Sequence, residues 1–173
     1  MGNLKTNKAA TLYQGDSAPV SLSSNPDGSA IASGHLDGAI CRFYFNDEVS
    51  GAAQGKFCTH TCVPTNLVWA EDLIVIGNDN IICMYSKEGK PLQKLLPSKE
   101  APNFDVSCVC TNSTGNSVII GGFNGLRILN YKNAQKKWEE APMKPLENMY
   151  TITTFGWKPD GSRLIIVCYY LLT

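Results

Sequence analysis

The sequence predicts an all-β protein built from a repeated four-stranded unit, and three observations carry this prediction. First, one pattern recurs: a glycine ends an apolar run, a tight turn follows, and the next apolar run contains an aromatic residue. The glycines of this pattern, Gly34, Gly77 and Gly121, lie 43 and 44 residues apart, a period typical of propeller blades. Second, Gly, Pro, Asn, Asp and Ser interrupt the chain about every 8–12 residues, as between short strands. Third, the chain has almost no helical periodicity.

Two turns recur in each unit and explain where the chain reverses. Asn and Gly tolerate the positive φ of tight hairpins, and Asp is favoured there because its side chain hydrogen-bonds the nearby backbone. The turn between the second and third strands is predicted at Asp37-Gly38, Asp79-Asn80 and Asn124-Gly125. The turn between the first and second strands is predicted at 25–28, 112–115 and 158–161, and the second unit shortens it to Glu71-Asp72.

The strands follow from the apolar runs between these turns. The first complete unit is predicted over about 18–60, with strands at 18–24, 30–34, 39–45 and 56–60. The second is predicted over 65–96, with strands at 65–70, 73–77, 81–86 and 91–96. The third is predicted over 106–141, with strands at 106–111, 117–121, 126–131 and 136–141. The second strand of each unit is almost continuously apolar, which indicates cover on both faces.

A partial unit is predicted at each end of the chain. The segment 4–15 contains an outer strand at 8–15 with no partner strands before it, and a truncated blade begins at 150 and runs to 173. Propellers close into rings of about 4–8 blades, so the predicted architecture is an incomplete propeller. Such an arc exposes strand edges and apolar blade faces at its ends. We expect it to be a piece of a larger propeller or to be completed by another chain.

Composition excludes several classes of function. The 173 residues carry 15 Lys+Arg and 15 Asp+Glu, and this neutral balance argues against a nucleic-acid or anionic-membrane surface. No apolar run approaches the roughly 20 residues of a membrane span, and the first residues lack the apolar core of a secretory signal. The seven cysteines, an odd number, are therefore expected to be reduced thiols. Five of them lie within apolar strand patterns and are expected to act as small apolar residues: Cys41, Cys83, Cys108, Cys110 and Cys168.

The strongest candidate for chemistry is the sequence Cys-Thr-His-Thr-Cys at 58–62. Zinc takes Cys and His ligands, and alternate residues share one face of a strand, so Cys58, His60 and Cys62 could converge on a metal or form a thiol centre. A fourth ligand is missing nearby, and the spacing is not the paired C-x₂-C of zinc ribbons. We favour the structural alternative, an outer strand that leads into the next blade.

Other suggestive residues are also better explained by packing. Cys108 and Cys110 are two residues apart, and side chains at that spacing on a strand are too distant to bond easily. Trp69 and Trp157 end first strands at matching positions, so blade-to-blade packing is expected rather than a ligand pocket. We expect no catalytic, cofactor-binding or metal-binding residues.

The period, the turns and the aromatic third strands resemble the WD-repeat family. The match departs from standard repeats in two ways. No Trp-Asp dipeptide closes a third strand, where the chain has Tyr44-Phe45, Met84-Tyr85 and Asn130-Tyr131. His35 is expected in a turn between strands rather than at the Gly-His position that opens a standard repeat, so the buried Asp-His-Ser-Trp network of standard repeats is not readable in this sequence.

A closer resemblance covers about 4–166, which is nearly the whole chain. It is carried by 6–56, 85–93, 117–131 and 138–164, and includes the loop and strand NDEVSGAAQGK, which propeller geometry does not demand. These segments resemble the amino-terminal propeller region of a large scaffold subunit of intraflagellar transport complex B. After Val167 the resemblance would require a Gly-containing hairpin turn, which CYYLLT does not supply.

This resemblance implies a non-catalytic scaffold and protein-interaction module that takes part in ciliary transport and cilium assembly. It implies other complex B subunits as partners, with no nucleic acid, membrane span or small-molecule substrate. The expected location is the cilium, at the axoneme and basal body, and the cytoplasm. Two alternatives remain open: a thiol- or zinc-dependent protein that uses Cys58, His60 and Cys62, and a regulatory decoy that occupies a partner of the longer subunit.

Overall fold

The computed structural model describes residues 2–3, 8–9, 11–12, 14–45, 54–97, 104–123, 125–143, 150–158 and 160–169. These residues form strands, turns and loops, and none of them is helical. Part of the predicted fragment 4–15, the loop at 46–53, Asn124 of one predicted hairpin turn and the terminal residues 170–173 lie outside the described residues. No helix in the described part of the chain is long and apolar enough to cross a membrane.

Three antiparallel sheets of four strands confirm the predicted repeating unit. The first sheet comprises β3 (Pro19–Ser24), β4 (Ala30–His35), β5 (Ala39–Tyr44) and β6 (Gly55–Thr59). The second comprises β7 (Asn66–Trp69), β8 (Leu73–Ile76), β9 (Ile82–Tyr85) and β10 (Pro91–Leu95). The third comprises β11 (Val106–Thr111), β12 (Ser117–Gly122), β13 (Gly125–Lys132) and β14 (Lys137–Glu140). In each sheet the strands pair in chain order, as the short connections require.

A two-stranded hairpin lies at each end of the described chain. β15 (Ile152–Trp157) pairs with β16 (Leu164–Cys168) where the truncated blade was expected. At the other end, β1 (Gly2–Asn3) pairs with β2 (Lys8–Ala9). The expectation of an outer strand over 8–15 without an earlier partner was therefore wrong. Among the described residues of 8–15, strand covers Lys8–Ala9, and Gly2–Asn3 supplies its partner.

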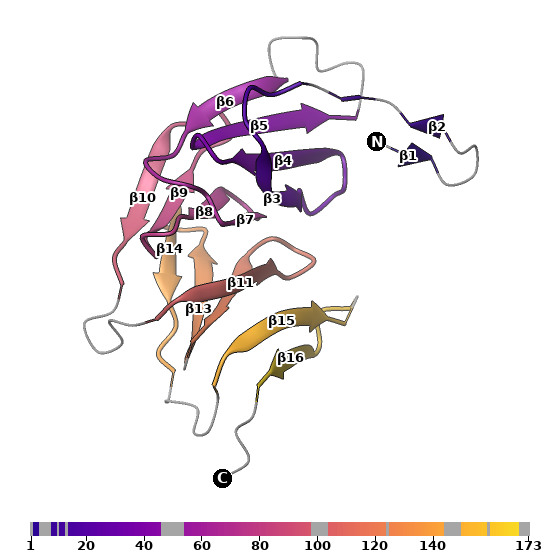
Figure 1. Ribbon diagram of the computed structural model, residues 1–173. Helices are drawn as coiled ribbons and strands as arrows, with labels where there is room; N and C mark the ends of the chain where they lie inside the picture. The colour runs from indigo at the N-terminus through magenta and orange to yellow at the C-terminus, as the bar shows by residue number, and fades with distance from the viewer. Residues whose placement is uncertain are drawn as a thin grey trace.

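The sheets lie side by side in chain order along an arc (Figure 1). Their first strands contact one another in the succession β3, β7, β11 and β15, so these strands form the inner edge of the arc. Three of them carry a β-bulge at the same place, between Pro19 and Ser21, between Val106 and Cys108, and between Ile152 and Thr154. The prediction of an incomplete propeller made of successive blades is confirmed.

The recurring turns have the predicted backbone conformation. Gly28, Gly115 and Gly161 adopt φ of 73°, 71° and 70°, and each donates its N–H to the carbonyl three residues earlier, at 2.8–3.1 Å. A side chain would be strained at these positions. In the β8–β9 turn it is Asn80 that takes the left-handed conformation, with φ of 57°. The repeat is therefore defined by the positive φ that each turn requires rather than by one fixed residue type.

The core lies between the sheets. The four residues of β8 are buried on both faces: Leu73 and Val75 join the apolar cluster with the first sheet, whereas Ile74 and Ile76 join the cluster with the third. Because side chains alternate across a strand, a central blade needs an uninterrupted apolar second strand. This confirms the prediction that the second strands are covered on both faces.

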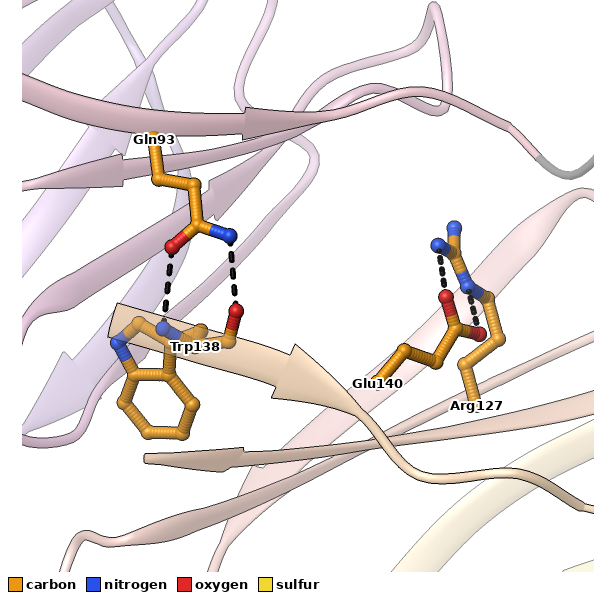
Figure 2. Close-up of polar contacts among 4 residues, drawn as sticks. All are labelled: Gln93, Arg127, Trp138 and Glu140. Atoms are coloured by element: carbon orange, nitrogen blue, oxygen red, sulfur yellow. Dashed lines mark hydrogen bonds and ion pairs between the residues drawn. The ribbon is translucent and has the colours of Figure 1, made fainter. Parts of the chain in front are cut away.

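Hydrogen bonds between neighbouring sheets join residues about one repeat apart. Ser21 Oγ donates to the Pro64 carbonyl at 2.6 Å, and the Trp69 N–H donates to Ser23 Oγ at 3.0 Å. At the outer edge, Gln93 in β10 contacts the backbone of Trp138 in β14 (Figure 2). Gln93 Nε2 donates to the Trp138 carbonyl at 2.8 Å, and the Trp138 N–H donates to Gln93 Oε1 at 3.0 Å. The amide thus bonds β14 as a neighbouring strand would.

A bidentate ion pair ties β13 to β14 within the third sheet (Figure 2). Arg127 Nε and Nη2 donate to the Glu140 carboxylate at 2.8 and 2.7 Å. The Arg127 side chain is only 9% exposed, whereas Glu140 is 41% exposed. The charge of the nearly buried guanidinium is therefore neutralised by a carboxylate that remains open to water.

The four-stranded sheet β3–β6 and the hairpin β15–β16, called the terminal sheets below because they flank the other two blades, carry large exposed apolar side chains. Leu22 in β3 is 67% exposed and Ile165 in β16 is 66% exposed. Val20, Val167 and Tyr169 add to these two surfaces. The equivalent positions of the central sheet are covered by its neighbours, so these exposed side chains mark the faces that a further blade would cover.

Candidate functional site

The most distinctive polar cluster lies where the first sheet passes to the second. The connection from β6 to β7 carries His60 and Cys62, and the β8–β9 turn carries Asp79. Their ligand atoms, His60 Nε2 or Nδ1, Cys62 Sγ and an Asp79 carboxylate oxygen, all lie within 4.8 Å of one another. His60 is buried, Cys62 is half-buried and Asp79 is exposed. The cluster therefore opens to solvent on the side of Asp79.

His60 is fixed in the cluster by the second sheet. Its Nδ1 lies 2.8 Å from the Tyr85 hydroxyl, and the two rings meet edge to face at 6.0 Å. His60 is 3% exposed. Burial lowers the pKa of its imidazole, against the opposing effect of the Asp79 charge, so the ring is neutral at neutral pH. Nε2 is buried and has no hydrogen-bond partner among the described residues.

The three ligand atoms gather over the Cα of Gly77. A Cβ at this position would overlap Cys62 Sγ and lie 3.0 Å from His60 Nε2 and 3.2 Å from Asp79 Oδ1. The backbone of Gly77 does not have positive φ, so the glycine is required here for space rather than for conformation. All three ligand atoms therefore face the point where any other residue at position 77 would carry its Cβ.

Asp79 is held by its own turn. Its Oδ1 accepts the N–H of Ile81 at 3.1 Å, and the Asn80 N–H donates to the Gly77 carbonyl at 3.0 Å. In the first sheet, Asp37 Oδ1 likewise accepts the N–H of Ala39, at 3.0 Å. The Asp of the second-to-third-strand turn is therefore a structural feature of the first two sheets. In the second sheet the ligand atoms of His60 and Cys62 also lie within 4.8 Å of it.

Cys58 does not take part in this cluster, so the hypothesis of a site made by Cys58, His60 and Cys62 is not supported. The hypothesis assumed that all three lie on one strand, but β6 ends at Thr59. Cys58 instead packs against the apolar cluster between the first two sheets. Burial raises the pKa of its thiol to about 12, which leaves very little nucleophilic thiolate at neutral pH.

A second buried histidine was also missed by sequence reasoning. His35 ends β4 and is 4% exposed; its Nε2 lies 2.9 Å from Ser33 Oγ and its Nδ1 lies 2.7 Å from the Ser17 carbonyl. The expectation that His35 lies in a turn between strands was wrong, because β4 extends to His35. No standard Trp-Asp dipeptide marks these networks in the sequence, because they form from different residue types in each sheet.

The remaining candidates have structural roles. Cys108 Sγ lies 3.7 Å from the Ile152 carbonyl, to which it is a weak donor. Trp69 and Trp157 end β7 and β15 as predicted, and Trp69 meets Tyr44 of the first sheet edge to face at 6.0 Å. Trp138 donates Nε1–H to Asp72 of the second sheet at 3.0 Å. The tryptophans Trp69 and Trp138 therefore join neighbouring blades.

Comparison with curated proteins gives consistent relatives. The chain is 42% identical over 167 residues to "Intraflagellar transport protein 172 homolog" of Homo sapiens, covering 96% of this chain and 10% of that protein. It is 41% identical over 165 residues to the Danio rerio homologue, covering 95% and 10%. It is 32% identical over 169 residues to "Intraflagellar transport protein 172" of Chlamydomonas reinhardtii, covering 96% and 10%. The chain spans about a tenth of the length of these relatives.

Comparison with solved structures supports the fold alone. The β-propeller domain of Myceliophteria thermophila Cps50 (Swd1) matches with a TM-score of 0.66 and 13% identity, over 96% of this chain and 54% of that one. The WD40 repeats of RRP9 match with a TM-score of 0.58 and 13% identity, over 82% and 42%. No family model matches the chain. The neighbours confirm the WD-repeat type of propeller blade.

Proposed function

Because the chain is homologous to a segment of intraflagellar transport protein 172, we propose that it is a non-catalytic scaffold module of the intraflagellar transport machinery. The observation that carries this proposal is the identity of 41–42% over 95–96% of the chain. The predicted resemblance extends into a loop that blade geometry does not dictate. We assign the module to cilium assembly and ciliary transport, at the axoneme and basal body of the cilium and in the cytoplasm.

The physical properties of the blades support a binding role rather than catalysis. The polar network of His35 lies within the first sheet and pairs both of its ring nitrogens. The hydrogen bond of Trp138 to Asp72 joins the third sheet to the second. Burial raises the pKa of several thiols, to about 12 for Cys58 and about 11 for Cys110, so these thiols are poor nucleophiles. Rigid blades with exposed turns and rims suit docking of other proteins.

We propose that the partners are other subunits of intraflagellar transport complex B and that they dock on the turns and rims of the blades. The test is a tagged pull-down of the 173-residue chain from an extract of ciliated cells, read by mass spectrometry. Complex B subunits should be enriched above an unrelated propeller of similar size. Recovery of chaperones alone would contradict the proposal.

A matched variant separates specific docking from nonspecific binding to the exposed apolar side chains. Leu22 and Ile165 are the most exposed apolar residues of the two terminal sheets apart from Tyr169, and replacing both with Ser lowers the apolar surface without touching the turns. Docking through turns and rims predicts that complex B recovery survives in this variant. Loss of that recovery would show that the captured proteins bind the uncovered blade faces instead.

A further inference from the structure

We propose that His60 Nε2, Cys62 Sγ and Asp79 Oδ1 form a binding site for one Zn²⁺ ion at the joint between the first and second sheets. This ligand set differs from the one that the sequence suggested, because Asp79 takes the place of Cys58. The site does not depend on the scaffold role, and its test below can fail or succeed independently of the pull-down.

The first argument is the state of His60. A buried polar atom without a partner is unfavourable, and Nε2 of this side chain is such an atom among the described residues. The Tyr85 hydroxyl can accept a hydrogen bond from Nδ1–H, at the 2.8 Å separation of the two atoms. That tautomer leaves the lone pair of Nε2 directed at Cys62 and Asp79. Histidines that bind metals are oriented by a second hydrogen bond of this kind.

The second argument is the convergence of the three ligand atoms. Ligand atoms of tetrahedral zinc, with bonds of about 2.0–2.3 Å, lie roughly 3.3–3.8 Å apart. The three atoms are within 4.8 Å of one another before any ion is considered, so a shift of about 1 Å by the half-buried Cys62 and the exposed Asp79 closes the set. The absence of a side chain at Gly77 is what lets these three atoms approach one another over its Cα.

The third argument is the chemistry of the ligands. A thiolate, an imidazole and a carboxylate are the three ligand types that Zn²⁺ accepts, whereas Mg²⁺ and Ca²⁺ prefer oxygen alone. On binding, a bond forms between Sγ and the metal, and the thiol proton passes to solvent. A water molecule would take the fourth position on the open side of the cluster. The ion would link the β6–β7 connection to the β8–β9 turn and so strengthen the joint between two blades.

Titration of the full 173-residue chain with Co²⁺, followed by displacement with Zn²⁺, tests the proposal. Wild-type protein should bind one Co²⁺ per chain, with thiolate-to-cobalt charge-transfer absorption in the near ultraviolet and visible bands of tetrahedral intensity. Cys62→Ala should abolish the charge-transfer band. Asp79→Asn, which retains the oxygen that accepts the Ile81 N–H, should weaken affinity at least tenfold.

Cys58→Ala is the matched control, because it removes the neighbouring thiol without touching the cluster, and its cobalt spectrum should equal that of wild type. Zn²⁺ should also raise the unfolding temperature of wild type and Cys58→Ala but not of Cys62→Ala. Circular dichroism without metal establishes that each variant is folded. Absence of the charge-transfer band in wild type, or its loss in Cys58→Ala with retention in Cys62→Ala, would overturn the proposal.

Discussion

The amide of Gln93 makes the most sharply testable contact between two blades. Gln93→Ala removes both of its hydrogen bonds to the backbone of Trp138, at 2.8 and 3.0 Å. A net contribution of about 0.5–1.5 kcal/mol for each bond predicts that the free energy of unfolding falls by roughly 1–3 kcal/mol. For a chain of this size that loss lowers the melting temperature by about 2–12 °C.

Two further variants make this prediction specific. Gln93→Glu keeps the acceptor for the Trp138 N–H but places a second oxygen against the Trp138 carbonyl, so it should destabilise at least as much as Ala. Leu92→Ala changes the preceding residue, which is 55% exposed, and should cost no more than about 0.5 kcal/mol.

The assay is urea unfolding followed by tryptophan fluorescence, with thermal unfolding by circular dichroism as a second probe. Equal stability of Gln93→Ala and Leu92→Ala would refute the argument that Gln93 substitutes for a neighbouring strand. A Gln93→Glu variant as stable as wild type would refute it also, because the donor would then contribute nothing.

Three other predictions concern buried groups. Asp72→Ala leaves the indole N–H of Trp138 without its acceptor and should cost about 1–3 kcal/mol, whereas Asp72→Asn keeps an oxygen there and should cost less. Burial raises the pKa of the Asp72 carboxyl, so the folded state binds its proton more tightly than the unfolded state does. The stability of wild type relative to Asp72→Asn should therefore fall as pH rises above the carboxyl pKa in the unfolded chain, which is about 4. Gly121→Ala places a Cβ 2.6 Å from Phe155 Cζ and 2.7 Å from Ile152 Cγ2, and should cost about 1–3 kcal/mol by overpacking. Cys58, whose thiol pKa burial raises to about 12, should react with iodoacetamide at pH 8 far more slowly than glutathione, and faster as pH rises.

Each of these has a direct check. Urea unfolding at several pH values compares the Asp72 variants, and a wild-type advantage that grows with pH would contradict the burial argument. Gly156→Ala is the control for Gly121→Ala, because nothing lies within 4 Å of its added Cβ, and equal losses in the two would contradict overpacking. Peptide mapping measures Cys58 alkylation, and a rate equal to that of urea-unfolded protein would show that the thiol is not protected.

The sequence by itself determined the repeat, the turns that recur in it and the strands of the three complete sheets. These features are local: a positive φ at Gly28 or Asn80 restricts the residue type at that position, and strand alternation is read over a few residues. The apolar run of β8 even indicated that both of its faces are covered. Inter-sheet hydrogen bonds such as that of Ser21 to Pro64, 43 residues away, preserve the same period in three dimensions.

Only the tertiary structure decided which polar residues meet. Along the chain, Cys58 is two residues from His60 and Asp79 is nineteen residues away, yet Asp79 joins the cluster and Cys58 does not. The reason is that β6 ends at Thr59, so alternation no longer governs the connection, while the hairpin of the next sheet returns Asp79 to the same joint. Proximity across a blade boundary depends on how two sheets pack, which local residue preferences do not encode.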